Sequence, residues 1–147
     1  RVAARVALAV GLAAVQTAET VNAACISGAH LSGRTVRLVS NLRPRVPIYA
    51  VTPSERVMRQ QQIHWGVVPM LGDVQGDMPS VVDNARDAVV SKGLLRPGDV
   101  AVFTAGDRST SPVVSKGPDG TESVAATNVM YVVQIRENDT TKQKGGK

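Results

Sequence analysis

Cysteine is almost missing from this sequence, and the single residue present, Cys25, excludes a disulfide within the chain. A reducing compartment is the simpler expectation, so we predict a cytoplasmic protein. Cys25 stands in an apolar run, which is typical of a buried and unreactive thiol.

Aromatic residues make up only 3% of the chain, so the core must be built from aliphatic side chains. The same scarcity argues against nucleic-acid binding, which relies on aromatic stacking, although the net charge is +5. The sequence also lacks a Gly-x-Ser-x-Gly elbow, a paired-cysteine site and a His-Glu-x-x-His motif. With one cysteine and two separated histidines, no metal site is expected.

Long hydrophobic runs are missing too. The stretch from residue 2 to residue 15 is apolar, but it is short for a membrane span and Arg5 interrupts it. It continues into polar residues as a helix instead of a cleavage region, so neither a membrane contact nor a signal peptide is expected. The chain opens at Arg1 on a helix already in progress, and we interpret it as a piece of a longer protein.

What is present indicates one globular domain. The chain has 147 residues, 43% of them hydrophobic and 20% charged, which suits a single packed core. We assign residues 1–135 to this domain. Residues 136–147 form a polar, basic tail with Lys142, Lys144 and Lys147 among glycines, and we predict that it is disordered.

Helical and strand patterns alternate along the chain. Helices are predicted at 1–21, 32–43, 53–63 and 77–92, and strands at 23–28, 47–52, 66–71, 100–105 and 127–135. This alternation predicts an α/β fold, a three-layer α/β/α sandwich around a mostly parallel five-stranded sheet. No helix separates the last two strands, only a loop at 106–126, so the fifth strand is expected to be antiparallel and at an edge.

Two helix starts carry recognisable caps. Thr52-Pro53-Ser54-Glu55 places a hydroxyl at the N-cap, proline at the first helical position and glutamate three residues after the cap. The helix that begins near Asp77 is predicted to turn Val82, Ala85 and Val89 inward.

The segment from Gly28 to Thr35 carries the most chemical information. A strand ends near Gly28, and Ser32-Gly33-Arg34-Thr35 begins a helix. Unpaired backbone N–H groups and the helix dipole favour an anion at such a start. Hydroxyls from Ser32 and Thr35, a following run of arginines without acidic residues, and His30 if it protonates all suit a phosphate. The competing interpretation is an ordinary N-cap followed by a solvated basic face.

The same segment reads Gly-x-x-x-x-Gly-Arg-Thr, which is a P-loop with arginine in place of lysine. A P-loop enzyme also needs an acidic residue on a second strand, and Asp107 is a weak candidate. A small NTPase or hydrolase that uses this loop therefore remains as an alternative.

An ordered set of motifs resembles the C-terminal domain of pyruvate kinase over about residues 5 to 135. It comprises Asn22-Ala23-Ala24, Ser32-Gly33-Arg34-Thr35, Arg43-Pro44-Arg45-Val46-Pro47-Ile48, Gly66-Val67-Val68-Pro69, Gly98-Asp99, Thr104-Ala105-Gly106 and Thr127-Asn128. The resemblance implies a regulatory domain that binds a phosphorylated effector, often a sugar phosphate, and helps to form a tetramer.

The resemblance also implies site residues. Ser32, Gly33, Arg34 and Thr35, with His30 beside them, would hold an effector phosphate, and the loop ending at Thr127 and Asn128 would close over the sugar. The parent enzyme would transfer phosphate from phosphoenolpyruvate to ADP in glycolysis with magnesium and potassium. Its catalytic (β/α)8 barrel is not in this chain, so no catalytic residue is expected here.

The sequence departs from the family pattern at two places. His30 stands where many members have threonine, and Glu122-Ser123-Val124-Ala125-Ala126 replaces a turn rich in proline and glycine. Both departures lie where the effector would be gripped, so its identity, and whether one binds, stays open. A stand-alone module of the same fold, which binds phosphometabolites without kinase activity, is the alternative.

Overall fold

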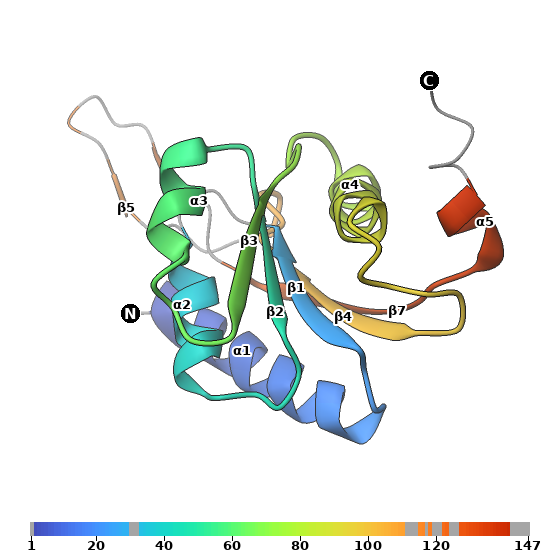
Figure 1. The fold of residues 1–147 in the computed structure, drawn as a ribbon. Coiled ribbons are helices and arrows are strands. Elements are labelled where there is room, and N and C mark those ends of the chain that lie inside the picture. The colour runs from blue at the N-terminus through green and yellow to red at the C-terminus, as the bar shows by residue number, and fades with distance from the viewer. Residues whose placement is uncertain are drawn as a thin grey trace.

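The chain folds around one mixed sheet of five strands. The computed structural model describes residues 2–29, 33–110, 115, 116, 118, 122, 123 and 127–141. The strands are β1 (Cys25–Ala29), β2 (Ile48–Thr52), β3 (Val67–Leu71), β4 (Val100–Ala105) and β7 (Val129–Gln134), in the order β3-β2-β1-β4-β7. The first four are parallel, and β7 pairs with β4 in the antiparallel direction at the edge (Figure 1). The predicted sheet is confirmed, including its antiparallel edge strand.

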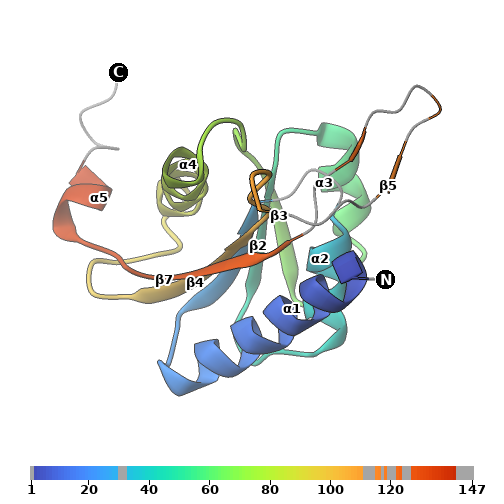
Figure 2. The ribbon, with the colours of Figure 1, turned by 180° about the vertical axis from the view of Figure 1, so that it is seen from behind.

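Helices cover both faces of the sheet, as predicted. One face carries α1 (Val2–Thr20), α2 (Arg34–Asn41) and α3 (Glu55–Gln61), and the other carries α4 (Met78–Ser91) (Figures 1 and 2). Alternate residues of each buried strand serve one core or the other. On β4, Val102 packs with the side of α1 and α2, whereas Phe103 packs with the side of α4.

Aliphatic side chains form both cores, as the scarcity of aromatic residues predicted. Phe103 is the largest fully buried side chain, and β1, β2 and β4 are buried along nearly their whole length. Cys25 is completely buried among them, and burial, together with the charge of Asp99, raises the pKa of its thiol to about 12. The unreactive thiol expected from the sequence is consistent with this position.

Helix α1 packs closely onto its neighbours through small residues. By length and composition alone it could cross a membrane, but it contacts α2 and β4, and Gly11, Ala14 and Ala18 are buried. A Cβ at position 11 would lie 2.5 Å from Cδ2 of Leu38, so glycine permits this close approach. The outward face of α1 remains apolar, with Leu8 and Leu12 exposed.

The predicted cap of α3 is wrong by two residues. Ser54, not Thr52, is the N-cap, and its Oγ accepts a hydrogen bond from Val57 N at 3.2 Å. Thr52 is still the last residue of β2, and its Oγ1 accepts from Ser54 N at 3.3 Å. Pairing with Leu71 of β3 holds Thr52 in the sheet, so the helix begins later than the local pattern indicates.

Replacing Ser54 with alanine is expected to lower the free energy of unfolding by about 1 kcal/mol, because the first turn of α3 loses its side-chain acceptor. Chemical denaturation followed by circular dichroism measures this change. Ser91→Ala is the matched control, since that hydroxyl donates to Ala88 O on an exposed helix end. Equal losses in the two variants would contradict the cap assignment.

Helix α4 begins where it was expected but presents a slightly different face. Asp77 is its N-cap, and Oδ1 of Asp77 accepts from Ser80 N at 2.9 Å. Hydrogen bonds from the side chain and then the backbone of Ser80 lower the pKa of this carboxyl. The buried side chains are Val81, Ala85, Val89 and Val90. Val82, predicted to point inward, is only partly buried at the margin of the core.

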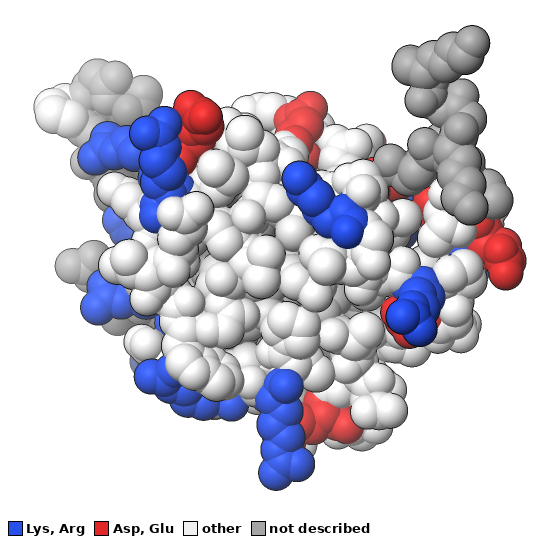
Figure 3. All heavy atoms as spheres, in the orientation of Figure 1, with Lys and Arg blue, Asp and Glu red and all other residues white. Residues whose placement is uncertain are grey.

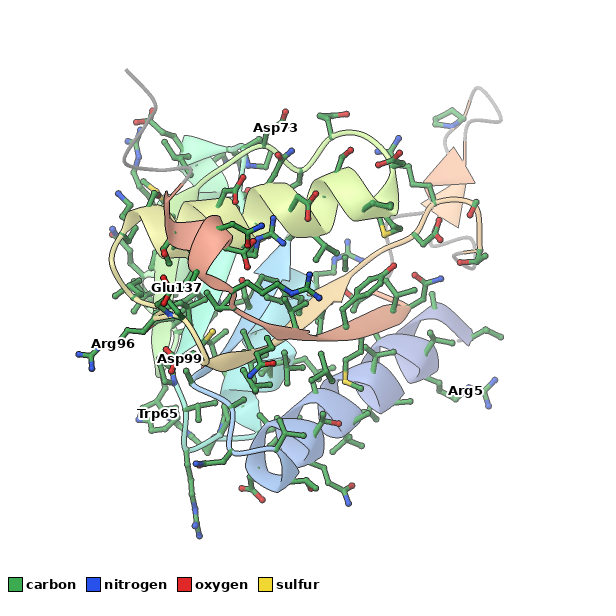
Figure 4. The ribbon with its side chains drawn as sticks, turned by 90° about the vertical axis from the view of Figure 1, so that its right-hand side faces the viewer. Arg5, Trp65, Asp73, Arg96, Asp99 and Glu137 are labelled. Atoms are coloured by element: carbon green, nitrogen blue, oxygen red, sulfur yellow. The ribbon has the colours of Figure 1, made fainter. Side chains whose placement is uncertain are left out.

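Two turns support the strands beside α4. Asp73 Oδ1 accepts from Gln75 N at 2.9 Å in the turn after β3. Asp99 Oδ2 accepts from Arg96 N at 2.8 Å before β4, and the Arg96 side chain points away from the domain (Figure 4). Figure 4 also places Asp73 and Asp99 at opposite ends of the sheet.

The prediction of a disordered tail is wrong for its first part. Residues Glu137–Thr141 form α5, where Asp139 Oδ2 accepts from Arg136 N at 2.8 Å. Asp139 is buried and lies 3.7 Å from Nε of Arg86 on α4. The prediction used only the polar composition of residues 136–147, and composition does not reveal an ion pair with a residue of α4. Residues 142–147, including the three lysines, lie outside the described part of the chain.

The loop predicted at 106–126 contains a short two-stranded ladder between β5 (Ser115–Lys116) and β6 (Glu122–Ser123). The strand predicted at 127–135 is confirmed as β7, although its pairing begins two residues later. Glu122 and Ser123 of the replaced turn before Thr127 thus belong to β6, whereas residues 124–126 lie outside the described part of the chain.

Candidate functional site

The candidate site lies at the carboxyl end of β1, where ligands bind in open α/β sheets. β1 ends at Ala29, and α2 begins at Arg34 after the N-cap Gly33. Two of the predicted site residues, His30 and Ser32, lie outside the described residues. The structure therefore places Gly33, Arg34 and Thr35 from the predicted phosphate segment, and Thr127 and Asn128 from the predicted loop.

Gly33 has a backbone that other residues adopt poorly. Its φ is +74°, in the left-handed region, and a Cβ at this position would lie 2.5 Å from Nε2 of Gln61. The N-cap of α2 therefore requires a residue without a side chain. As a consequence, no side-chain hydrogen bond caps this helix.

The first turn of α2 is an open donor site. The first N–H donated back along the helix is that of Arg37, which binds Gly33 O at 3.1 Å. The N–H groups of Arg34, Thr35 and Val36 have no acceptor within the helix. No acidic residue lies in this turn, so the partial positive charge of the helix end is not neutralised locally.

The fold brings the two predicted segments into direct contact. Thr35 Oγ1 and Thr127 Oγ1 are 2.6 Å apart and share a hydrogen bond between residues 92 positions apart in the sequence. Both side chains are buried, with 7% of Thr35 and 1% of Thr127 exposed. The start of α2 is thus connected by one bond to the residue that leads into β7.

Asn128 is engaged in the turn after β4. Its N–H donates to Ala105 O at 3.1 Å, and its Oδ1 accepts from Asp107 N at 2.8 Å. Its Nδ2 donates to Thr110 Oγ1 at 2.9 Å. Asn128 therefore positions the entrance of the long loop through both ends of its amide, and its predicted contact with an effector stays a prediction.

Asp107, the weak candidate for the acidic residue of a P-loop enzyme, accepts hydrogen bonds within the same turn. Its Oδ1 accepts from Ser109 N at 2.9 Å and from Ser109 Oγ at 2.7 Å. In the part of the chain that the structure describes, no three His, Cys, Asp or Glu side chains gather in a way that could hold a metal ion.

The four arginines after Ser32 do not form one cluster. Arg34 lies in the first turn of α2, whereas Arg43 and Arg45 follow its other end, about 12 Å away for a helix of eight residues. Arg43 stacks on Trp65, with 4.8 Å between the guanidinium carbon and the ring centroid. Only Arg34 of these four thus lies in the open turn.

Basic residues do gather beside the site, but from two helices. Figure 3 shows Lys and Arg side chains along the side of the molecule that carries α2 and α3. Arg34 and Arg37 belong to α2, and Arg56 and Arg59 to α3, where Arg59 is partly neutralised by Glu55 at 3.2 Å. This positive surface favours the approach of an anion.

The sequence reasoning missed one residue beside this helix start. Gln61, the last residue of α3, is only 2% exposed and faces Gly33. Its Nε2 and Oε1 are buried without a hydrogen-bond partner among the residues that the structure describes. No sequence signal distinguishes it from Gln60 and Gln62, since the three are consecutive and only the tertiary packing buries the middle one.

Comparisons with known proteins agree with this architecture. A family model described as "Pyruvate kinase, alpha/beta domain" matches residues 8–133. Pyruvate kinase 2 of Synechocystis sp. is 44% identical over 101 residues, which are 67% of this chain and 17% of that protein. The pyruvate kinase of Clostridium acetobutylicum is 35% identical over 97 residues, 66% of this chain and 20% of that protein.

The pyruvate kinase of Staphylococcus epidermidis is 38% identical over 98 residues, covering 67% of this chain and 17% of its own length. The matched region thus spans a fifth or less of these three relatives. The family match extends from α1 into β7, so it includes both segments of the candidate site. The chain therefore belongs to the pyruvate kinase family, of which it contains the alpha/beta domain.

Proposed function

We propose that this domain binds a phosphorylated effector at the start of α2 and takes part in regulating and assembling a pyruvate kinase. The observation that carries the proposal is the first turn of α2, which has no side-chain cap and is joined to Thr127 through Thr35. In the parent enzyme, phosphate would pass from phosphoenolpyruvate to ADP, giving pyruvate and ATP in the cytoplasm.

Three features of the site favour a phosphate over other ligands. The N–H groups of the first turn are donors without an intrahelical acceptor, and the helix dipole adds partial positive charge. Gly33 has no side chain of its own that could cover these N–H groups. Arg34 and Thr35 add a cation and a hydroxyl donor, and Ser32 and His30 precede them in the sequence.

Regulation would begin with the hydrogen bond between Thr35 and Thr127. If Thr35 Oγ1 donates its proton to a phosphate, it can only accept a hydrogen bond from Thr127 Oγ1. Thr127 lies between the long loop and β7, so this fixes the direction of the hydrogen bond at the end of the loop. Ligand binding would thereby bias the arrangement of the 106–126 loop. Allostery also requires a second site with different affinity in two states, and the barrel of the parent enzyme would supply it.

Assembly would use the apolar surface that the domain leaves exposed. Tyr131 and Val132 are exposed on β7, which has one edge without a strand partner among the described residues. Such an edge favours pairing with another chain, and the outward face of α1 is apolar as well. We propose that these surfaces contact other parts of a homo-oligomer, a tetramer in the parent enzyme.

Catalysis would remain with the parent enzyme. Magnesium and potassium would act in its catalytic barrel, which this chain does not contain, and the chain alone is proposed to be inactive. No proposed role of Gly33, Arg34 or Thr35 in the domain depends on a metal ion.

Calorimetric titration of the purified chain tests the effector site. Fructose 1,6-bisphosphate, ribose 5-phosphate, AMP and inorganic phosphate are the ligands. At least one phosphorylated compound is expected to bind, and the Ser32→Ala/Thr35→Ala variant is expected to lose that binding. A Thr20→Ala/Ser91→Ala variant, altered at exposed helix ends away from α2, is the control. Binding that survives in the first variant would place the site elsewhere.

A further inference from the structure

Gln61 is an exception to the rule that buried polar groups find hydrogen-bond partners. Only 2% of the residue is exposed, yet neither Nε2 nor Oε1 has a hydrogen-bond partner within the described part of the chain. Burying an amide without partners destabilises a fold, so a leucine would suit this position better if packing alone decided it. An unsatisfied group of this kind calls for a partner outside the described residues, and a bound ligand is one such partner.

The Gln61 side chain is directed at the start of α2. Measured from the position of a Cβ on Gly33, Nε2 lies at 2.5 Å, whereas Cδ and Cγ both lie at 3.4 Å. The carboxamide end therefore approaches the N-cap most closely. Its own helix is held at both ends, by the Ser54 cap and by the hydrogen bond from His64 N to Gln61 O at 3.1 Å.

We propose that the carboxamide of Gln61 is a ligand-contacting group of the α2 site and selects phosphate monoesters that carry a hydroxyl close to the phosphate. This inference rests on the proposed effector site. The amide nitrogen donates to a phosphate oxygen, as do the backbone N–H groups of the first turn. The amide oxygen is an acceptor, so it needs a donor that an ionised phosphate ester lacks and a hydroxyl supplies.

A site that hydrogen-bonds a hydroxyl discriminates against ligands without one, because its own polar group is then left buried and unpaired. In the free domain, Nε2 and Oε1 of Gln61 are already buried without a hydrogen-bond partner among the described residues. Ligands that satisfy both of its ends gain affinity, whereas ligands that satisfy only the nitrogen gain less. Glycerol 3-phosphate and n-propyl phosphate form a suitable pair, since both are monoesters of similar size and only the first has hydroxyls.

The test compares wild type with Gln61→Leu, and with Gln61→Met in case leucine packs poorly. Two opposite changes are expected in the same variant. The melting temperature rises by about 2–6 °C because an unsatisfied amide leaves the core. The affinity for glycerol 3-phosphate falls by about 10-fold or more, and its advantage over n-propyl phosphate disappears.

Gln62→Leu is the matched control, because that neighbouring side chain is exposed. In wild type, the side-chain NH₂ resonances that Gln61→Leu removes are expected to shift when glycerol 3-phosphate is added. Unchanged affinity and unchanged discrimination in both Gln61 variants would overturn the inference. If Thr35→Asp still abolished binding, the effector site itself would stand. If no phosphate monoester bound, the inference and the proposed function would fail together.

Discussion

The Thr35→Asp variant is expected to bind any phosphorylated effector at least about 100-fold more weakly than the wild-type chain. Thr35 lies in the first turn of α2 and is 7% exposed, so the new carboxylate would occupy the space that a phosphate needs. Two like charges 4 Å apart repel by about 4 kcal/mol at an effective dielectric constant of 20. That repulsion alone exceeds the 100-fold expectation, since each 1.4 kcal/mol corresponds to about tenfold in affinity.

The fold should survive this substitution. A carboxylate near a helix N-terminus is stabilised by the dipole, by about 0.3–1 kcal/mol, and accepts from the open N–H groups. Loss of the hydrogen bond to Thr127 costs about 1 kcal/mol in the opposite direction. Burial of the carboxylate at this 7% exposed position adds a desolvation cost, so the stability of the variant is measured beside its affinity to separate a loss of binding from a loss of folding.

Calorimetry gives the affinity and circular dichroism gives the stability of the same sample. Thr20→Asp is the control, because it adds the same charge at the exposed carboxyl end of α1. Thr35→Val keeps the shape of the side chain and removes only the hydroxyl, and we expect an intermediate loss of affinity. If Thr35→Asp bound as tightly as wild type while folded, the start of α2 would not be the binding site.

The second large effect is expected on stability. Phe103→Ala should lower the free energy of unfolding by about 3–5 kcal/mol, the range for removing a buried phenylalanine. Phe103 is the only phenylalanine, is 2% exposed, and lies on the interior strand β4 in the core on the side of α4. The core on this face is mostly aliphatic, and its other buried ring, that of Tyr49, lies on β2, two strands away from β4. Since domains are stable by about 5–15 kcal/mol, the variant should be close to unfolding at 37 °C.

Tyr131 is a stringent control for this prediction. It is the antiparallel partner of Phe103 across β4 and β7, so the two rings come from the same face of the sheet. Tyr131 is 36% exposed, however, and Tyr131→Ala should cost only about 1 kcal/mol. Urea denaturation of both variants measures the difference. Similar losses of unfolding free energy in the two variants would mean that Phe103 on β4 contributes no more to stability than Tyr131 on the edge strand β7.

Most of the fold follows from short-range patterns in the sequence. Apolar runs of strand length, separated by helical periodicity, are sufficient to predict the parallel strands and their helices. The lack of a helical pattern between Ala105 and Thr127 was sufficient to predict an antiparallel fifth strand. The position of the predicted phosphate segment after a strand and at a helix start is likewise a local property, and Gly33, Arg34 and Thr35 are predicted on this ground.

Local patterns failed where a distant partner decides the outcome. The α3 helix begins at Glu55 because pairing holds Thr52 in the sheet, although Thr52 and Pro53 match the pattern of a helix start. The first residues of the polar tail form α5, where Asp139 meets Arg86 on α4. In both cases a tertiary interaction overrides the local preference.

The sequence by itself determined the kind of sheet, the aliphatic core, and the helix start where an anion would bind, because these depend on neighbouring residues along the chain. Only the tertiary structure decided what surrounds that helix start. Thr35 contacts Thr127 across 92 residues, and Gln61 of a separate helix lies beside it with both polar side-chain atoms unpaired among the described residues. The physical reason is that burial and hydrogen-bond partners are set by packing between elements, and no local pattern distinguishes the buried glutamine from its two exposed neighbours.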